Sequence, residues 1–187
     1  MTVKDVLIIA AGNLARSDLA AELTALTSSD TPSDEAASLL RCYRLVESEV
    51  ALDYYPLENT ERFLPILNRV SYTAFSSSPV NIIDVKDENG ERVNFSVYAS
   101  YISVPEDTGE VSVHYTYAPP QGDYSDALPF PARISAQLLS LGVCSEFLLS
   151  CGRYAEAAVW EGKFREGLRD VGVFRRKLCA IRARRWV

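Results

Sequence analysis

The spacing of apolar residues changes twice along this chain of 187 residues, and these changes constrain the fold more than any single motif. In residues 33–54 apolar side chains advance by threes and fours, which is the period of a helix with one buried face. In residues 70–117 they alternate with polar ones, as in half-buried strands. From residue 134 the helical period returns. The sequence therefore predicts an α+β fold, with helices at both ends and strands between them.

Helix-capping residues divide the first part of the chain. Thr2 can cap a helix from Val3 to Ala11, and a short helix is expected from Ser17 to Leu26. Ser33, followed by two acidic residues, opens a longer helix that Pro56 ends. Three helices are therefore expected before the strands.

The helical period returns as two segments joined by Gly152 and Arg153, which predicts an antiparallel helical hairpin. Pro129 and Pro131 precede its first helix, in which Leu141 is expected on the buried stripe and Ser140 outside it. The second helix is expected from Tyr154 to about Val171. Its predicted inner stripe is Ala157, Trp160, Phe164, Leu168 and Val171.

Alternating apolar residues predict about four antiparallel strands. The alternating sets are Val80 and Ile82, then Val93, Phe95 and Val97, then Val111, Val113, Tyr115 and Tyr117. The predicted turn between the first two sets is Asp87, Glu88, Asn89 and Gly90, since Asn-Gly supplies the positive φ angles of a tight hairpin. This hairpin tip is expected to face solvent or a partner, and it lacks the ligand spacing of a calcium loop.

The order of helices and strands predicts how the chain is organised. Residues 1–57 and 128–174 are expected to pack as an antiparallel helical bundle. Residues 58–127 are expected to protrude from it as a small inserted antiparallel β domain. The last thirteen residues, 175–187, are expected to form an extended basic C-terminal tail, here called the basic tail.

The basic tail is set apart by its charge. It holds six of the 19 basic residues and none of the 25 acidic ones, so it carries +6 while the remaining 13 basic and 25 acidic residues leave the rest at −12. Such a segment is typical of an interaction site, although a solubilising end is the alternative. Apolar side chains among the arginines favour docking on a protein. The expected docking residues are Arg175, Arg176, Lys177, Leu178, Ile181, Arg182, Arg184, Arg185 and Trp186.

Few residues offer enzyme chemistry. His114 is the single histidine, and the alternation places it on a strand as a solvated or cross-strand residue. No phosphate-binding glycine loop is present. The four cysteines, Cys42, Cys144, Cys151 and Cys179, lack metal or redox spacing and are expected to be small core residues. We therefore expect no enzyme activity, no cofactor and no metal; an enzyme acting through Asp, Glu or Tyr is the least favoured class.

The longest apolar stretch, Val6 to Ala11, is too short to span a bilayer. Lys4 and Asp5 make a poor start for a signal peptide. The sequence therefore predicts a soluble protein that is not secreted by that route and has no membrane partner.

Two segments carry a resemblance to a known family. One is the end of the central helix, Asp53-Tyr54-Tyr55-Pro56-Leu57, and the other is the helix-Gly-helix segment of residues 133–164. With the small sheet between them and the basic tail after them, the chain resembles the head-to-tail adaptors of tailed bacteriophages. The most similar type is the podovirus tail tubular protein A, or gatekeeper-ring, connector.

The resemblance implies a structural virion protein at the head-tail junction, made in the host cytoplasm. It implies a homo-oligomeric ring, expected to be a dodecamer, between the portal protein and a downstream tail or nozzle protein. The helices would build the ring wall, the basic tail would dock on the portal, and the sheet would face a neighbouring subunit or the next tail component. Packaged DNA would pass through without specific binding, which suits an acidic body.

A second class of function stays open from the residues alone. The chain would then be a cytoplasmic, non-enzymatic binding module whose basic tail contacts nucleic acid. The predicted fold is the same in both cases. Mass in solution or in the assembled particle separates them, because a ring of about a dozen subunits favours the adaptor.

Overall fold

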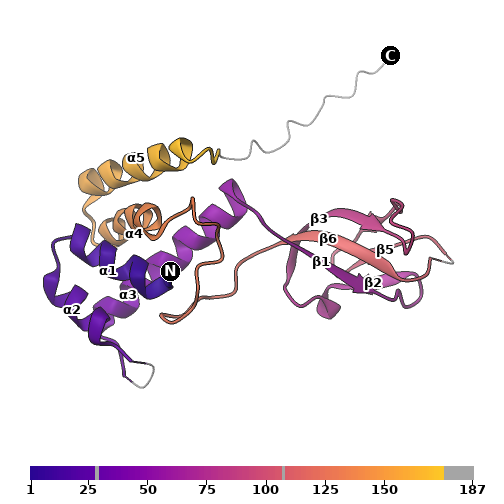
Figure 1. Cartoon of the computed structure of the whole chain (residues 1–187), viewed down its shortest axis with the longest axis horizontal. Coiled ribbons are helices and arrows are strands. Elements are labelled where there is room, and N and C mark those ends of the chain that lie inside the picture. The colour runs from indigo at the N-terminus through magenta and orange to yellow at the C-terminus, as the bar shows by residue number, and fades with distance from the viewer. Residues whose placement is uncertain (28–29, 107, 175–187) are drawn as a thin grey trace, which may run out of the picture.

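The computed structural model describes residues 1–27, 30–106 and 108–174. Over these ranges the chain is a mixed α/β protein with five α-helices and two small antiparallel sheets of three strands each. Figure 1 shows the helices gathered at one side of the molecule and the strands at the other. All six strands lie between the third and fourth α-helices in the sequence. The predicted mixture of helices and strands is therefore confirmed.

Local capping fixes the first two helices. Helix α1, Val3–Asn13, begins at Thr2, whose side chain accepts from the Asp5 amide while its own amide donates to Asp5 Oδ2 at 2.7 Å. Helix α2 is Ser17–Ala25. At its C-terminal end the Lys4 ammonium donates hydrogen bonds to the carbonyl oxygens of Thr24 and Leu26, at 2.9 and 2.8 Å. A cation at this end is favourable for the helix dipole. Both helices occur where the sequence predicts them, and α1 runs two residues further than expected.

Helix α3, Asp34–Glu49, is capped by the predicted Ser33, whose hydroxyl accepts from the Ala36 amide at 3.2 Å. The chain then widens into a π-helical turn, η1, Val50–Tyr54. The Tyr55 amide closes this turn on the Val50 carbonyl oxygen at 2.6 Å. After this turn the chain passes through Pro56 and enters the first strand, which begins at Leu57.

Helix α4, Ala136–Ser150, packs against α1, α3 and α5. Helix α5, Tyr154–Asp170, follows the link at Gly152, where φ is +75°. The predicted helical hairpin is therefore present, but the predicted exposure along α4 is wrong. Ser140 is fully buried and Leu141 only half-buried, because α4 has helices on several sides and not one. The Ser140 hydroxyl lies 3.2 Å from Asn13 Nδ2, which donates to it.

The first sheet has the order β1-β6-β3, from Leu57–Phe63, Val111–Tyr117 and Pro79–Lys86. Strand β1 is absent from the sequence prediction, because Leu57 is its one fully buried residue and most of its side chains are polar. It pairs along its length with β6, from Leu57 opposite Tyr117 to Phe63 opposite Val111. Because β1 is an edge strand with mostly polar side chains, its sequence shows little of the apolar alternation that predicts a strand.

The second sheet has the order β2-β5-β4, from Arg69–Ser71, Tyr101–Ser103 and Ser96–Val97. The expectation of about four strands is thus too low, and Val93 and Phe95 lie outside the strand predicted for them. A short 3-10 helix, η2, Tyr72–Ala74, follows β2. The two sheets share one apolar core, made of Val70, Phe75, Val85, Ile102, Val104, Val111, Val113 and Tyr115. The helices enclose a separate core.

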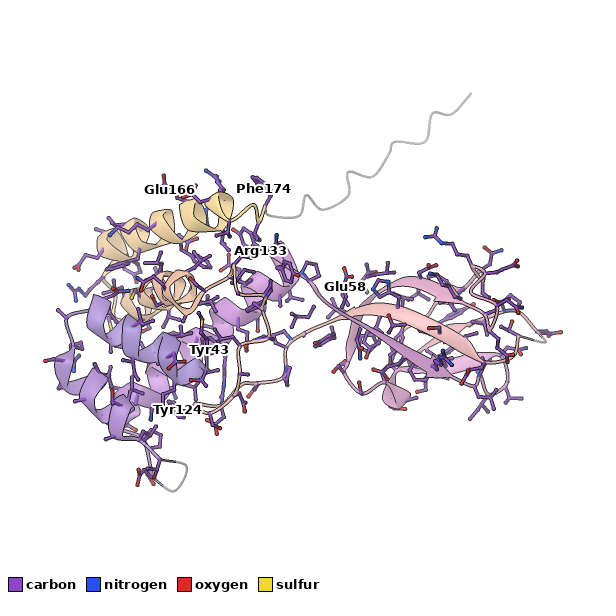
Figure 2. All side chains as sticks on the ribbon, in the orientation of Figure 1. Tyr43, Glu58, Tyr124, Arg133, Glu166 and Phe174 are labelled. Carbon is purple, nitrogen blue, oxygen red and sulfur yellow. The ribbon has the colours of Figure 1, made fainter. Side chains whose placement is uncertain are left out.

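Residues 118–128 return from β6 across the helices. The amides of Val3 and Lys4 donate to the carbonyl oxygens of Asp126 and Tyr124 at 2.9 and 3.0 Å. Arg44 on α3 donates to the Gly122 carbonyl oxygen at 2.9 Å. Figure 2 labels Tyr124 on this segment and Tyr43 on α3. The returning segment is therefore fixed to both α1 and α3.

Candidate interaction surfaces

The predicted docking residues of the basic tail, residues 175–187, lie outside the described residues. The structure does describe where this segment begins. After α5, Gly172 adopts a φ of +73° and the Val173 amide donates to the Leu168 carbonyl oxygen at 2.9 Å. Val173 is buried, whereas Phe174 is 68% exposed. The last described residue before the basic tail is therefore an exposed aromatic on a firmly anchored helix end.

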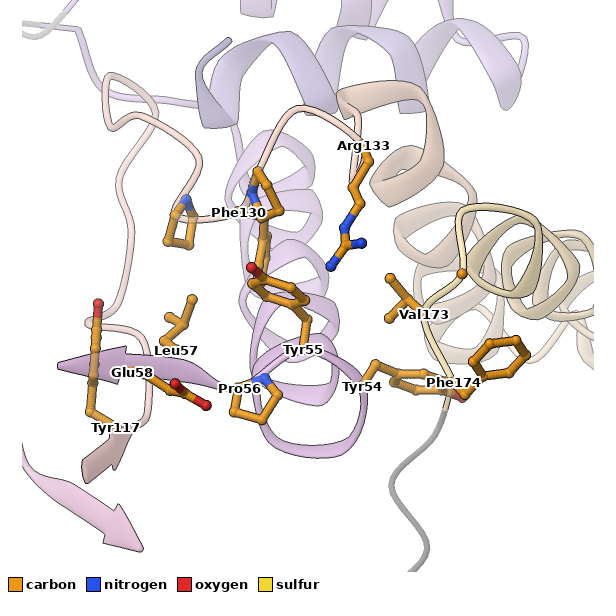
Figure 3. A pocket seen from close by; sticks show the side chains of 13 residues that line it. Tyr54, Tyr55, Pro56, Leu57, Glu58, Tyr117, Phe130, Arg133, Val173 and Phe174 are labelled. Carbon is orange, nitrogen blue, oxygen red and sulfur yellow. The ribbon is translucent and has the colours of Figure 1, made fainter. Parts of the chain in front are cut away.

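Phe174 lies at one edge of a groove where helices and strands meet, here called the junction groove. The groove has a volume of about 780 Å³ and is lined mainly by aromatic and proline side chains. Figure 3 shows Tyr54 beside Phe174, and Tyr55 close to Arg133. The Arg133 guanidinium lies over the Tyr55 ring, 5.2 Å from its centroid. An arginine of the same chain thus contacts an aromatic ring within this groove.

The predicted hairpin tip, Asp87 to Gly90, is a turn in the structure. The Gly90 amide donates to the Asp87 carbonyl oxygen at 3.0 Å, and Asp87 Oδ1 accepts from the amides of Asn89 and Glu91 at 2.9 and 2.8 Å. Gly90 has a φ of +82°, whereas Asn89 is not left-handed. The turn is thus confirmed, but it closes through one left-handed residue and not two. Whether the tip faces a partner stays a prediction.

Glu88 of the hairpin tip is bound within the chain. Its Oε1 accepts from the Glu110 amide at 3.0 Å, which joins the tip to the turn before β6. A Cβ atom on Gly109 would lie 2.7 Å from the same oxygen, so the carboxylate packs closely against this glycine. Nearby, Asp84 pairs with Arg92 at 3.3 Å. Within the described ranges no three His, Cys, Asp or Glu side chains are grouped to hold a metal ion.

A further exposed surface follows β1, and the sequence prediction missed it. Residues 64–68, here called the distal loop, present Leu64, Ile66 and Leu67 with 75%, 77% and 85% of their surface exposed. A lone exposed leucine is ordinary, but three adjacent ones form a patch. The run Leu-Pro-Ile-Leu was the available signal. That run is too short to show a period, so the sequence pattern does not predict the patch.

The distal loop is a strained tight turn. The amides of Ile66 and Arg69 each donate to the carbonyl oxygen of the other residue, at 3.0 and 3.1 Å. Leu67 and Asn68 between them have φ values of 52° and 61°. Two left-handed residues define a type I′ hairpin, for which Asn and Gly are preferred. A leucine in this conformation costs about 1–2 kcal/mol.

A third uncovered surface lies between α1 and the start of α4, and it is here called the α1 groove. It has a volume of about 440 Å³, and its lining is Met1, Asp5, Ile8, Ile9, Ser135, Ala136 and Gln137. Ile8 and Ile9 are only half-buried, while Met1 is 70% exposed. The groove is therefore mainly apolar, with a single carboxylate at its rim.

Among the potentially reactive side chains, His114 is paired across strands, and Cys42 and Cys144 are buried. His114 Nε2 on β6 lies 3.2 Å from Glu58 Oε2 on β1, as expected of a cross-strand residue. Burial raises the pKa of the Cys42 thiol to about 11 and that of Cys144 to about 12, so both stay protonated at neutral pH. Cys151 is exposed, contrary to expectation, because it follows the last residue of α4. Cys179 lies outside the described residues.

No described helix combines the length and apolar character needed to cross a membrane. No protein-family model matches the sequence, and comparison with curated proteins finds no match.

Proposed function

We propose that this chain is a structural, non-enzymatic subunit of a bacteriophage head-to-tail adaptor, with its basic tail docked on the portal protein. The observation that supports the proposal is that the basic residues are concentrated after the last helix while the rest of the chain is acidic. A segment of +6 follows a body of −12, and it begins at an exposed aromatic, Phe174, on an anchored helix end. A basic run of this kind at the end of an acidic chain is typical of a segment that binds another molecule.

In the proposed adaptor, residues 1–57 and 128–174 act as an antiparallel helical bundle and residues 58–127 as an inserted β domain. Separate apolar cores in the helices and in the strands support this division. Extensive contacts among the described elements join helix to helix or strand to strand. The bundle would form the ring wall, while the strands would reach a neighbouring subunit or the next tail component.

The composition of the basic tail sets the chemistry of its docking site. Arginine side chains bind carboxylates through paired hydrogen bonds, and Trp186 fills an apolar pocket when it is buried in an interface. The proposed site on the portal is therefore an acidic groove with at least one apolar pocket. Thirteen extended residues span roughly 43 Å, which is enough to cross from one ring to the next.

The proposed ring also lets packaged DNA pass. A body with a net charge of −12 repels phosphates once the basic tail is occupied on the portal. We place the protein in the virion at the head-tail junction, between the portal and a downstream tail or nozzle protein. The ring is proposed to be a dodecamer.

A comparison of three chains tests the docking claim: the full chain, a chain ending at Phe174, and Trp186→Ala. Each is tested against the portal ring encoded in the same genome and against duplex DNA. Truncation should abolish portal binding without unfolding the body, and Trp186→Ala should weaken it by about 2 kcal/mol or more. Undiminished portal binding by the truncated chain would contradict the proposal.

The second candidate is a binding module whose basic tail contacts nucleic acid, and the same charge division favours it. Its signature is the salt dependence of binding. The affinity for DNA would fall with a log-log slope of roughly −0.9 for each phosphate neutralised. Removing two arginines would then weaken binding more than Trp186→Ala. In the adaptor, DNA affinity should be negligible for all three chains.

A further inference from the structure

Helices α3, α4 and α5 meet along one side of α4. A Cβ atom on Gly142 of α4 would lie 2.9 Å from Val46 Cγ1 on α3 and 3.2 Å from Phe164 Cζ on α5. Glu146 lies one helical turn beyond Gly142, on the same side of α4, and it is only partly buried. Glu146 is therefore on a strip of α4 that α3 and α5 flank.

Exposed leucines lie beside partly buried carboxylates on this part of the surface. Along α3 and the turn after it, Leu45, Glu49 and Leu52 are four and then three positions apart, so they share one side. On α4, Leu149 follows Glu146 by three positions. Leu45, Leu52 and Leu149 are 60%, 46% and 41% exposed. The acidic face is defined here as Leu45, Glu49, Leu52, Glu146, Leu149 and Glu161.

The carboxylates of the acidic face lack sufficient positive charge around them. Burial and repulsion from Glu161 raise the pKa of both Glu49 and Glu146, and Arg165 opposes this only in part at Glu49. Arg165 is itself paired with Glu161. Within the described ranges, neither Glu49 nor Glu146 accepts a hydrogen bond. Additional cations would therefore stabilise this surface.

Most basic residues that the structure describes have partners elsewhere. Of the 13 that precede the basic tail, six pair with carboxylates, two bind carbonyl oxygens and three lie over aromatic rings. The other two are Arg41, two turns before Glu49 on α3, and Arg169, in the last turn of α5. The largest further group of cations in the chain is the basic tail, with six.

The basic tail is attached within reach of the acidic face. It follows Phe174, and Glu161 lies 13 positions earlier on α5. At 1.5 Å per residue of helix, the attachment point is roughly 20 Å from Glu161. Seven extended residues span roughly 23 Å, so a tail of thirteen residues can return along α5 and cover the face. A short tether of this kind gives an effective concentration in the millimolar range, which favours the same molecule over a second copy.

We infer that the basic tail of the free chain folds back and binds the acidic face of its own molecule. Its arginines pair with Glu49 and Glu146, and Leu178, Ile181 and Trp186 pack on the exposed leucines. This inference deepens the proposed function and rests on it for the identity of the competitor, which is the portal. The portal then displaces the tail from the acidic face, so the free subunit keeps its tail covered until the portal is present.

Trypsin cleavage of the full chain measures whether the basic tail is held. Every basic residue of the tail is a cleavage site, and a bound tail is cut only after it is released. The double variant Glu49→Gln, Glu146→Gln removes the two carboxylates. Because burial already disfavours their charged forms, the variant should keep the wild-type denaturation midpoint.

The double variant should lose its tail at about ten times the wild-type rate, as followed by mass spectrometry of the chain. The matched control is Glu106→Gln with Glu166→Gln, which removes the same charge at exposed positions outside the acidic face. It should leave the rate unchanged. The wild-type rate should also be independent of protein concentration, because the tail and the face belong to one molecule.

Equal cleavage rates for the wild type and Glu49→Gln, Glu146→Gln would overturn the inference, and so would an equal acceleration in the control pair. A wild-type rate that falls as the protein concentration rises would mean that the tail binds a second copy, which also contradicts it. These measurements do not involve the portal. A failure of the full chain to bind the portal therefore counts against the proposed function and not against the intramolecular contact.

Discussion

The Tyr43 hydroxyl donates a hydrogen bond of 2.7 Å to Glu47 Oε1, one helical turn further along α3, and both side chains are buried. Glu47 is only 3% exposed beneath the segment that returns from β6. Burial raises the pKa of Glu47, and the hydrogen bond from Tyr43 and the nearby Arg44 oppose this only in part. The folded state therefore holds a proton on Glu47 more tightly than the unfolded chain does.

This relationship predicts a pH-dependent effect of Glu47→Gln. With a raised folded-state pKa, the contribution of Glu47 to stability is fully present below its ordinary pKa of 4.5 and falls as pH rises through the folded value. Glutamine does not titrate and can still accept from Tyr43. The variant should therefore gain stability relative to the wild type as pH rises from about 4 to 7, as measured by urea unfolding. A difference that stays constant with pH would contradict this.

Glu61 on β1 is predicted to have the opposite pH dependence. Burial acts to raise its pKa, but hydrogen bonds from Ser76, Tyr115 and Asn59 outweigh it and lower the pKa. The contribution of the carboxylate to stability is thus present above its ordinary pKa of 4.5 and is lost as pH falls through the folded value.

Glu61→Gln should cost about 1–3 kcal/mol at pH 7, because several donors lose a charged acceptor. The difference from the wild type should shrink in acid. Glu106→Gln, at an exposed position between β5 and β6, is the control and should change stability by less than about 0.5 kcal/mol. Equal effects of the two substitutions would show that the network around Glu61 contributes little.

Helix α4 should be the main source of stability among the helices. Leu139 is fully buried, so Leu139→Ala should cost about 2–5 kcal/mol through lost burial and a residual cavity. Ser140→Ala should cost about 1 kcal/mol, because Asn13 loses its hydrogen-bond partner. Leu149→Ala, at an exposed position on the same helix, should have a much smaller effect. Denaturant midpoints measure all three, and a large effect at Leu149 would contradict the assigned packing.

Local signals explain what the sequence predicts correctly. The caps at Thr2 and Ser33, and the turn at Gly90, depend on residues within a few positions of each other. Such contacts form in the same way in many folds, so the sequence pattern is enough to place them.

The features that the sequence did not predict depend on neighbours distant in the chain. Strand β1 is specified by pairing with β6, whose partner residues lie 48 to 60 positions later, because Leu57 is its one buried residue. Ser140 is buried because α1 lies against α4, which no pattern within α4 reveals. The distal loop and the α1 groove were missed for the same reason, since exposure at a tip or between helices is a tertiary property.

Electron microscopy of the full chain mixed with the portal ring tests the central claim most directly. The account predicts a second ring of this protein beneath the portal, with density for residues 175–187 on the portal surface and Trp186 in a pocket. A chain ending at Phe174 should leave the portal bare under the same conditions. A portal that remains bare with the full chain, or a second ring that forms equally well without the basic tail, would contradict the account.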